Sequence, residues 1–364
     1  MLGVIMKQTE YKTLLLNTHY WSNLPPEEQG IGLNKLSEYI KQTTPKQLFR
    51  FRDCSERSFD AFYKDQIWTS SADVMNDDFD ARMFFRLEEL ENWIKTQNGV
   101  QIFKELLTIH NKTGEPPSHV KEIIPDIESL FQLAKHIPTE SFESMEQKLK
   151  TIFLDGCDSY RDDLIRSIQQ RTRFACFSKN VRSPLMWGHY ADSAAGFALA
   201  YNFKDSPLFD DDGYFSKQYG CELYPVLYTS QRFDATDYAK NFWIHHIIQV
   251  GLQLNGISFD SNHLWRVLPP VDLFSNKKIA LHKSKDWAPE KEWRLFINPY
   301  NLTDANCRHL PLPKRPCAIY LGRKISSINE KILTGIASEK KLPVFKMDVV
   351  NDKEGYKLHP KKIQ

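Results

Sequence analysis

The sequence predicts an α+β fold, in which strands and helices follow one another irregularly around a long helical stretch. Segments typical of strands, with β-branched, aromatic or alternating apolar residues, occur at 47–52, 66–71, 173–178, 196–202, 221–229, 291–297 and 317–322. Between about 86 and 170, apolar residues recur instead at every third or fourth position, as they do on amphipathic helices. Strands and helices in mixed order favour the α+β class over a regular succession of βαβ units.

The helical stretch divides the chain into four predicted parts. Residues 1–46 form an N-terminal helical extension, 47–85 and 171–330 form the α+β core domain, 86–170 form a helical insertion, and 331–364 form a C-terminal segment. Within the core domain, a further helix is predicted at 237–254. The Lys-rich stretches KKLPVFK and HPKKIQ near the end of the chain are predicted as loop and tail.

Composition excludes several classes of protein. The 364 residues include 48 Lys plus Arg and 46 Asp plus Glu, and this balance argues against an overall polyanion-binding surface. Six scattered cysteines form no CxxC pair, so we expect no structural zinc site and a reducing, cytoplasmic location. No apolar run approaches the roughly 20 residues of a membrane span, and we expect no membrane partner.

The stretch KSKDWAPEKEWRLFI, residues 283–297, places unusual charges on a predicted strand. With a side-chain period of two, Glu290, Glu292 and Arg294 share one face, while Trp293 and Leu295 share the other. One interpretation is a solvated edge with a Glu–Arg pair. The other is a strand that packs one face on the core and presents its carboxylates to a pocket.

The strand at 47–52 shows a similar division. Arg50 and Arg52 share a face opposite Phe49 and Phe51. A guanidinium offers paired donors that suit a diphosphate, so both arginines are candidate ligand-binding residues. The structural alternative is that they pair with Asp80 or with the glutamates of the later strand.

The densest part of the sequence is FACFSKNVRSPLMWGHYADSAAGFALAYN, residues 174–202. It predicts a strand that ends at Ser178, a loop, a short helix through LMWGHYAD and a second strand. Ser178 is a candidate site residue or a cap of the turn that follows it. His189 is a candidate general base, although a histidine on an aromatic helix is more often a packing residue. Trp187 and Tyr190 are expected in the core or in a pocket wall.

The turn NDDFDAR, residues 76–82, carries Asn76, Asp77 and Asp80. Carboxylate and amide oxygens of this kind bind hard metal ions, but hydrogen bonds within an Asx turn explain them more simply. We therefore predict no metal site.

These motifs together resemble the bacterial domain of unknown function 2971 family. The resemblance rests on LFRFR, IWTSS, NDDFDAR, CFSKNVRSPLMWGHYADSAAGFALAY, DWAPEKEWRL and IYLGRKIS, in this order, from about residue 48 to 327. Asp78 stands where the family usually has proline, which leaves that turn less rigid. The family name specifies no reaction.

The order of the motifs also resembles the R-S-E class of ADP-ribosyltransferases. This resemblance implies a mixed β core of that type, NAD as cofactor, an arginine (Arg50 or Arg52) on the NAD phosphates or ribose, and Ser178 at a strand end. It implies that Glu292 stabilises the developing oxocarbenium charge and that Glu290 orients the nucleophile. The predicted catalytic residues are Glu292, Glu290 and Ser178. The predicted cofactor-binding residues are Arg50, Arg52, Ser70, Trp187, His189 and Tyr190.

We therefore expect an ADP-ribosyltransferase-like enzyme that modifies a protein or a nucleic acid. By analogy of class, such an activity suits a bacterial toxin or phage-defence effector with an antitoxin or regulatory partner. Two alternatives stay open. One is a nucleic-acid-binding or partner-binding module without catalysis. The other is a metal-dependent nuclease built on Asp77, Asp80, Glu290 and Glu292. The enzyme hypothesis requires the two glutamates and the two arginines to line one pocket.

Overall fold

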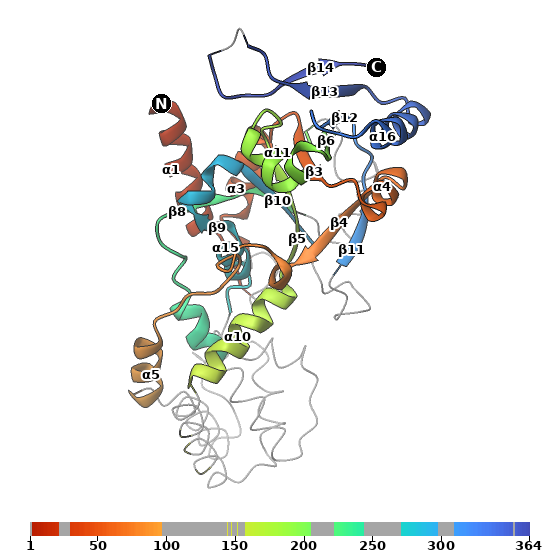
Figure 1. Ribbon diagram of the computed structural model, residues 1–364. Coiled ribbons are helices and arrows are strands. Elements are labelled where there is room, and N and C mark those ends of the chain that lie inside the picture. The colour runs from red at the N-terminus through yellow and green to blue at the C-terminus, as the bar shows by residue number, and fades with distance from the viewer. Residues whose placement is uncertain are drawn as a thin grey trace. The chain divides into compact units, whose positions relative to one another are not determined.

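A computed structural model describes residues 2–21, 30–96, 157–204, 222–243, 271–297, 309–351 and 354–364, with the single positions 144, 147 and 151. The chain divides into two compact units that interleave along the sequence. Figure 1 labels helices and strands that are named below. Unit 1 comprises residues 1–36, 82–167 and 232–279, and unit 2 comprises 37–81, 168–231 and 280–364. The predicted insertion at 86–170 thus falls largely in a unit that also includes 1–36 and 232–279, and the predicted boundary at 330 falls inside unit 2.

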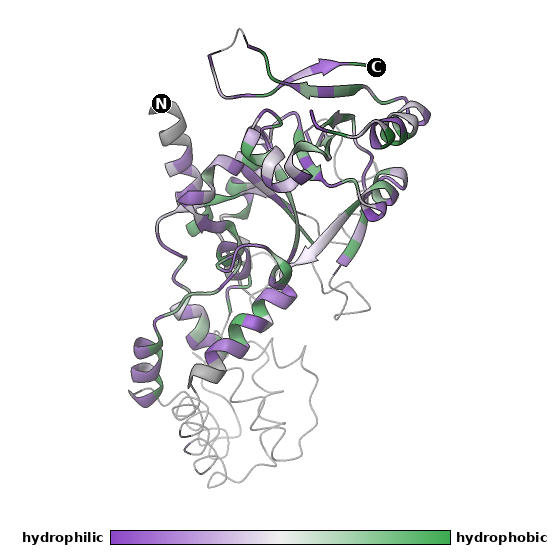
Figure 2. Ribbon diagram, viewed as in Figure 1, coloured by the Kyte–Doolittle hydropathy of each residue, from purple (hydrophilic) through white to green (hydrophobic). Residues whose placement is uncertain are grey.

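Unit 1 is mainly helical in its described part. It contains α1 (Leu2–Leu16), the two-stranded antiparallel pair β1 (His19–Tyr20) and β2 (Gly30–Ile31), and α5 (Leu87–Thr96). Three helices cross the division between the units: α3 (Leu33–Thr43), α10 (Cys157–Arg171) and α15 (Ser275–Leu281). Figure 2 shows hydrophilic and hydrophobic bands alternating along α10. This alternation is typical of a helix with one buried face.

A buried aspartate connects distant parts of unit 1. The Oδ2 atom of Asp272 accepts from His19 Nδ1 at 2.9 Å, and Lys278 Nζ lies 3.1 Å from the same oxygen. Lys278 is 2% exposed. The backbone amide of Tyr20 donates to the other oxygen of Asp272 at 2.8 Å. The ion pair therefore compensates a lysine that has almost no contact with water.

Unit 2 is built around a large mixed sheet. Its helices are α4 (Glu56–Tyr63), α11 (Pro184–Tyr190) and α16 (Ser327–Glu339), with the 3-10 turns η1 (Ala72–Val74), η2 (Asp192–Ala194) and η3 (Lys285–Glu290). Its strands are β3 (Leu48–Arg52), β4 (Gln66–Ser71), β5 (Arg173–Ser178), β6 (Phe197–Tyr201), β7 (Glu222–Pro225), β8 (Leu227–Thr229), β9 (His282–Ser284), β10 (Glu292–Ile297), β11 (His309–Pro313), β12 (Ala318–Leu321), β13 (Val344–Asp348) and β14 (His359–Lys362).

The strand order in the main sheet is β11-β4-β5-β3-β6-β12-β13-β14, and β10 pairs with β5 and β7. The β12–β13 pair is parallel, whereas the other pairs of this sheet are antiparallel. Strands β8 and β9 form a separate parallel pair. The predicted α+β class with a mixed sheet is therefore confirmed.

The sheet opens along one side of β5. Strand β3 pairs with the last residue of β5, where Phe49 faces Ser178. Strand β4 pairs with the beginning of β5, where Ser71 faces Arg173. Between these two points, the middle of β5 has neither strand as a partner on that side. A cavity, described below, is lined by residues of this unpaired middle and of β3 and β4.

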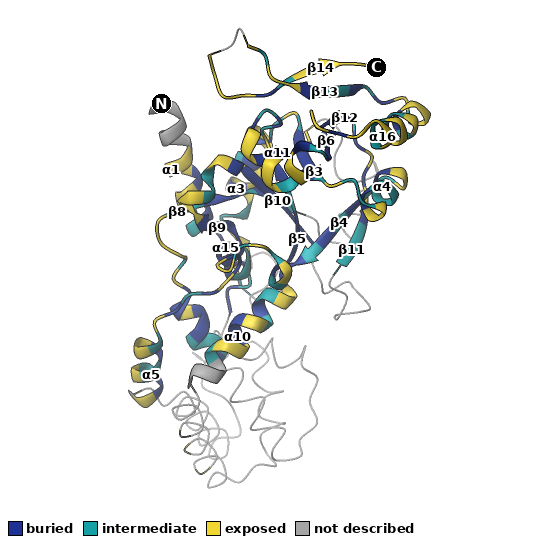
Figure 3. Cartoon of the chain, in the orientation of Figure 1, coloured by how far each residue is buried: buried dark blue, intermediate teal, exposed yellow. Residues whose placement is uncertain are grey.

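Strand β10 is interior, which decides between the two interpretations of its charged face. It lies between β5 and β7, and all six of its residues are buried (Figure 3). Glu292 is 6% exposed and Arg294 is 0% exposed, so a solvated edge is excluded. The strand also starts later than predicted. Glu290 ends η3, and Lys291 has a left-handed backbone (φ 49°), so Glu290 lies outside the strand.

A strained turn places α11 against β3. Asp192, Ser193 and Ala194 have φ values of 48°, 52° and 70°, which non-glycine residues rarely adopt. Hydrogen bonds hold this turn: Gly196 N donates to Ala191 O at 2.8 Å, and Lys324 N donates to Ala194 O at 2.9 Å. A Cβ atom at Gly196 would lie 2.1 Å from the carbonyl oxygen of Arg52, so only glycine permits this approach.

Two predicted segments at the end of the chain differ from the structure. KKLPVFK and HPKKIQ were predicted as loop and tail, but β13 and β14 lie there and extend the sheet. Strand β14 is largely exposed, so its sequence lacks the apolar alternation of a covered strand (Figure 3).

The predicted helical stretch is described only at its two ends. Residues 87–96 and 157–171 are helical, and most of 97–156 lies outside the described residues. The predicted helix at 237–254 is helical over 236–243, and its remainder is not described. In the described ranges, no helix combines the length and apolar character that crossing a membrane requires.

Candidate functional site

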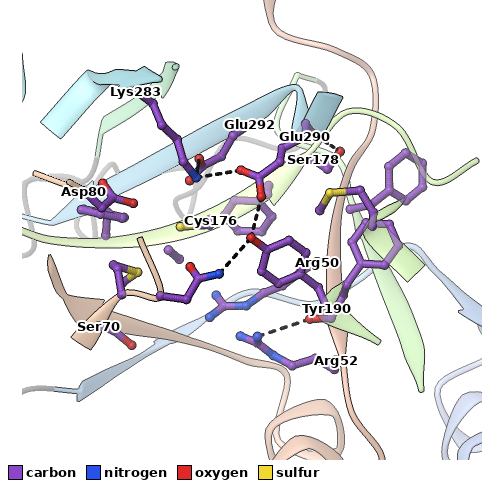
Figure 4. Close-up of a pocket in the computed structure, with 18 residues that line it drawn as sticks. Arg50, Arg52, Ser70, Asp80, Cys176, Ser178, Tyr190, Lys283, Glu290 and Glu292 are labelled. Atoms are coloured by element: carbon purple, nitrogen blue, oxygen red, sulfur yellow. Dashed lines mark hydrogen bonds and ion pairs between the residues drawn. The ribbon is translucent and has the colours of Figure 1, made fainter. Parts of the chain in front are cut away.

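An inner cavity of about 210 Å³ lies in unit 2, where the sheet opens beside β5 (Figure 4). Both predicted arginines and both predicted glutamates line it. The lining also includes Ser70, Asn76, Asp80, Cys176, Ser178, Tyr190 and Lys283. The geometry that the enzyme hypothesis requires is therefore present within one unit.

One side of the inner cavity is a buried network of alternating charges. Arg294 donates to both oxygens of Asp80, at 2.6 and 2.7 Å, and to both oxygens of Glu292, at 2.8 and 3.2 Å. Lys283 Nζ then bridges Glu292, at 3.0 Å, and Glu290, at 2.7 Å. Three carboxylates and two cations leave this network with one uncompensated negative charge.

The network fixes the charged forms of Glu292, Lys283 and Arg294. Burial alone would raise the pKa of Glu292, but Arg294 and Lys283 outweigh it and lower that pKa to about 2. Burial likewise opposes the charged forms of Lys283 and Arg294, yet the neighbouring carboxylates raise the pKa of both. Glu292 is therefore ionised at neutral pH, and both of its oxygens are occupied by protein cations.

Glu290 ends the network on the side of Tyr190. The Tyr190 hydroxyl donates to Glu290 Oε1 at 2.5 Å and accepts from Asn76 Nδ2 at 3.2 Å. Burial, together with the hydrogen bond to Glu290, raises the pKa of Tyr190. Ser178 Oγ donates to the backbone carbonyl of Glu290 at 2.6 Å and accepts from Asn180 N at 3.1 Å. Ser178 thus holds the end of β5 to the turn that carries Glu290.

Arg50 is the most unusual cation of the cavity. It is 9% exposed, and one of its terminal nitrogens donates to the carbonyl of Trp68. Its Nε and Nη1 atoms are buried and find no hydrogen-bond partner among the described residues. Burial, with a contribution from Arg52, lowers the pKa of Arg50 to about 9. Two buried donors without an acceptor are costly, and an anionic ligand would satisfy them.

The cysteines near the site are poor nucleophiles at neutral pH. Burial, with a contribution from Glu292, raises the pKa of the Cys176 thiol well above its usual range. Burial raises the pKa of Cys54 to about 11. Because the thiolate is the reactive form, the site favours carboxylate chemistry over thiolate chemistry.

A larger outer cleft, of about 890 Å³, shares Arg50, Phe51, Arg52, Ser70 and Tyr190 with the inner cavity. Its other lining residues are Asp53, Cys54, Ser55, Arg57, Ser58, Ala61, Trp68, His189, Asp192, His309 and Asn329. The two spaces therefore adjoin. One contains buried carboxylates and the other is rich in arginine and hydroxyl groups.

The predicted cofactor-binding residues do not all line the same space. Ser70 and Tyr190 line both spaces, and the exposed His189 lines the outer cleft, although packing was its simpler interpretation. The assignment of Trp187 to a ligand is corrected. Trp187 is 1% exposed, its Nε1 donates to Val181 O at 2.6 Å, and its ring packs against Phe51. It is a core residue that lines neither space.

Lys283 and the role of Asp80 were not predicted. Lys283 is the first residue of the stretch KSKDWAPEKEWRLFI. Its closeness in sequence to Glu290 and Glu292 could have indicated an ion pair with them. Asp80 was considered as a metal ligand, but Arg294 binds both of its oxygens. Among the described residues, no group of three or more His, Cys, Asp or Glu side chains is arranged to hold a metal ion.

The fold and the site define an α+β protein with a buried carboxylate–arginine pocket. Residues 186–295 match the family model described as "Protein of unknown function (DUF2971)", which confirms the family resemblance over this stretch, shorter than the expected 48–327. This match spans α11 to β10 and includes Tyr190, Glu290 and Glu292, whereas Arg50 and Asp80 lie outside it. Comparisons with curated proteins and with solved structures gave no match.

Proposed function

We propose that this protein cleaves NAD at the bond between nicotinamide and ribose and transfers ADP-ribose to a macromolecule. The observation that carries the proposal is that Glu290 and the partly unpartnered Arg50 line the same cavity. A carboxylate suits the cationic sugar of the transition state, and a guanidinium with free donors suits the phosphates. NAD carries negative charge on its phosphates and develops positive charge on its ribose during cleavage, so a site for this reaction needs both the guanidinium and the carboxylate.

The reaction breaks the bond between the ribose C1′ atom and the nicotinamide nitrogen. The bonding electron pair leaves with nicotinamide, which becomes neutral, and positive charge develops on the ribose ring. An acceptor hydroxyl, amine or carboxylate, or water in hydrolysis, then forms a bond to C1′. Where the nucleophile carries a proton, that proton passes to the carboxylate of Glu290. NAD is the substrate of this reaction and is consumed by it.

The charge network favours Glu290 as the catalytic carboxylate. The motif order assigned the electrostatic role to Glu292, but two cations, Arg294 and Lys283, bind the carboxylate of Glu292. The carboxylate of Glu290 has one cation, Lys283, on Oε2 and the neutral hydroxyl of Tyr190 on Oε1, and Tyr190 lines both spaces. We therefore assign the sugar-facing role to Glu290 and a positioning role to Glu292, which holds Lys283 beside Glu290.

The macromolecular acceptor and the toxin or phage-defence role are parts of this proposal that rest on analogy of class. The cytoplasmic location, also part of the proposal, rests on the scattered cysteines. An antitoxin or other regulatory partner would be expected for such an activity. The metal-dependent nuclease is less well supported, because Arg294 compensates the carboxylates of Asp80 and Glu292.

The test is turnover of labelled NAD by wild-type protein and by Glu290→Gln and Glu292→Gln, with and without cell lysate. Glu290→Gln should lower kcat by 10²–10³-fold with little change in thermal stability, because one electrostatic contact in the transition state is lost. Glu292→Gln should lower thermal stability, because Arg294 and Lys283 lose a buried partner. Loss of turnover in Glu292→Gln with full turnover in Glu290→Gln would reverse the assignment.

Wild-type protein that releases no nicotinamide in any lysate would refute the proposal. Binding of RNA or DNA that weakens steeply with salt would then favour the nucleic-acid-binding module.

A further inference from the structure

The outer cleft has the size and the chemistry of a site for a phosphate-bearing ligand. Its volume of about 890 Å³ lies within the range of roughly 300–1,000 Å³ found for pockets that bury most of a small ligand. It adjoins the inner cavity through Arg50, Arg52, Ser70 and Tyr190. A ligand in the outer cleft can therefore extend toward Glu290.

The cationic end of the cleft is formed by β3 and the start of α4. Arg50 is more than nine-tenths buried, lines the cleft and has two donor atoms without a partner. The half-buried Arg52 lies on the same strand face. Ser55 caps α4, and Ser55, Arg57 and Ser58 of its first turn also line the cleft. The Ser55 and Ser58 hydroxyls donate to the Asp53 carboxylate, at 2.8 and 2.6 Å, so the buried Arg50 and the half-buried Arg52 are the groups that favour a phosphate here.

The cleft also has an aromatic platform. The exposed Arg57 lies over the indole ring of Trp68, with 5.1 Å between its guanidinium carbon and the ring centroid. Trp68 is half-buried and lines the cleft. Its backbone carbonyl accepts from Arg50, so the platform is tied to the buried arginine. Nucleic-acid bases stack on tryptophan and on arginine guanidinium planes in this manner.

We propose that the outer cleft is a nucleoside diphosphate site, with the phosphates against Arg50 and Arg52 and the base against Trp68 and Arg57. The orientation rests on the proposed function: the ADP half of NAD lies in the outer cleft, and the nicotinamide–ribose half lies beside Glu290. The nucleoside diphosphate site does not depend on NAD cleavage, because Arg50, Arg57 and Trp68 all line the outer cleft.

The test is calorimetric titration of the full chain with ADP and with inorganic pyrophosphate. Trp68→Leu should weaken ADP binding roughly tenfold, since stacking contributes about one such factor per base, and should leave pyrophosphate binding unchanged. Arg50→Met should weaken both ligands by at least tenfold. Arg57→Met should also weaken ADP binding. Because Arg57 is exposed, this variant should fold, so it tests the site even if Arg50→Met does not fold.

Arg166→Met serves as the control, because Arg166 is an exposed arginine of the other unit. It should leave the affinity for ADP unchanged. Wild-type protein that does not bind ADP, or Trp68→Leu and Arg57→Met that bind ADP as tightly as wild type, would overturn the site. Glu290→Gln should retain ADP affinity. ADP binding of the expected kind without release of nicotinamide by wild type would support the site and refute the proposed function.

Discussion

Arg294→Leu tests the charge network most sharply, because Arg294 compensates two buried carboxylates. Asp80 is 3% exposed and Glu292 is 6% exposed, and the guanidinium bonds both oxygens of each. Removing one partner of a buried pair costs about 3–5 kcal/mol. For a unit of roughly 150–250 residues, each kcal/mol corresponds to about 2–4 °C, so we expect Tm to fall by about 6–20 °C at pH 7.

The loss should depend on pH in a defined direction. The pKa of Glu292 is lowered to about 2 in the folded state, below its ordinary value of about 4.3 when unfolded. Its ionised form therefore stabilises the wild-type fold above the unfolded pKa, and that contribution is lost as pH falls toward 2. In Arg294→Leu, Glu292 takes up a proton more readily, so the deficit in Tm should shrink as pH falls from 7 to 4.

Thermal unfolding followed by circular dichroism at both pH values provides the measurement. Lys64→Leu is the control within the same unit, because the Lys64–Asp60 pair is largely exposed and should contribute at most about 1 kcal/mol. A fall in Tm of less than about 3 °C for Arg294→Leu at pH 7 would refute the reasoning. So would a deficit that is the same at pH 4 and pH 7.

Three further predictions concern other parts of the molecule. Ser178→Ala should lower kcat for NAD more than it raises KM, because the Glu290 backbone loses its 2.6 Å hydrogen bond; equal activity of variant and wild type in a turnover assay would contradict this. Asp272→Asn should destabilise unit 1 by about 3 kcal/mol in urea titration, because it leaves the buried Lys278 without its carboxylate partner. Adding Lys278→Met should restore part of the lost stability, and a further loss would contradict the ion-pair argument. Cys54 should react slowly with iodoacetamide at pH 7.5 and faster as pH rises toward 11, and rapid labelling of folded protein at pH 7.5 would show that its pKa is not raised.

Local patterns were enough to predict the strands that form the centre of the site. Residues 48–52, 66–71 and 173–178 are strands as expected. Phe49 and Phe51 pack in the core, as their alternation with Arg50 and Arg52 predicted, but both also line the inner cavity. A period of two follows directly from the pleat of a strand and needs no tertiary information. The charged face of β10 was predicted in the same way.

Burial and pairing could not be predicted, because they depend on contacts between distant parts of the chain. Nothing in EKEWRLFI shows that β10 lies between two strands, or that Asp80, more than 200 positions earlier, binds Arg294. Strand β11 escaped prediction because its two prolines weaken the strand signal. Proline is tolerated there because, in the described residues, β11 pairs only with β4 and lies at the sheet edge.

The helix α11 shows the same limit at the level of single residues. Trp187 and His189 are two positions apart, and both were assigned to the ligand. On a helix, such residues point in different directions, so Trp187 enters the core while His189 reaches the outer cleft. The short helix has too few residues for a periodic pattern to show which of the two faces inward.

The central claim is that one NAD molecule spans the two adjoining spaces, with its ribose beside Glu290. A crystal structure of Glu290→Gln soaked with NAD measures this most directly, since the variant should bind NAD and cleave it slowly. We expect the ribose C1′ atom within contact distance of residue 290, the phosphates on Arg50 and the adenine against Trp68. Density for NAD elsewhere, or adenine in the inner cavity beside the glutamates, would contradict the account.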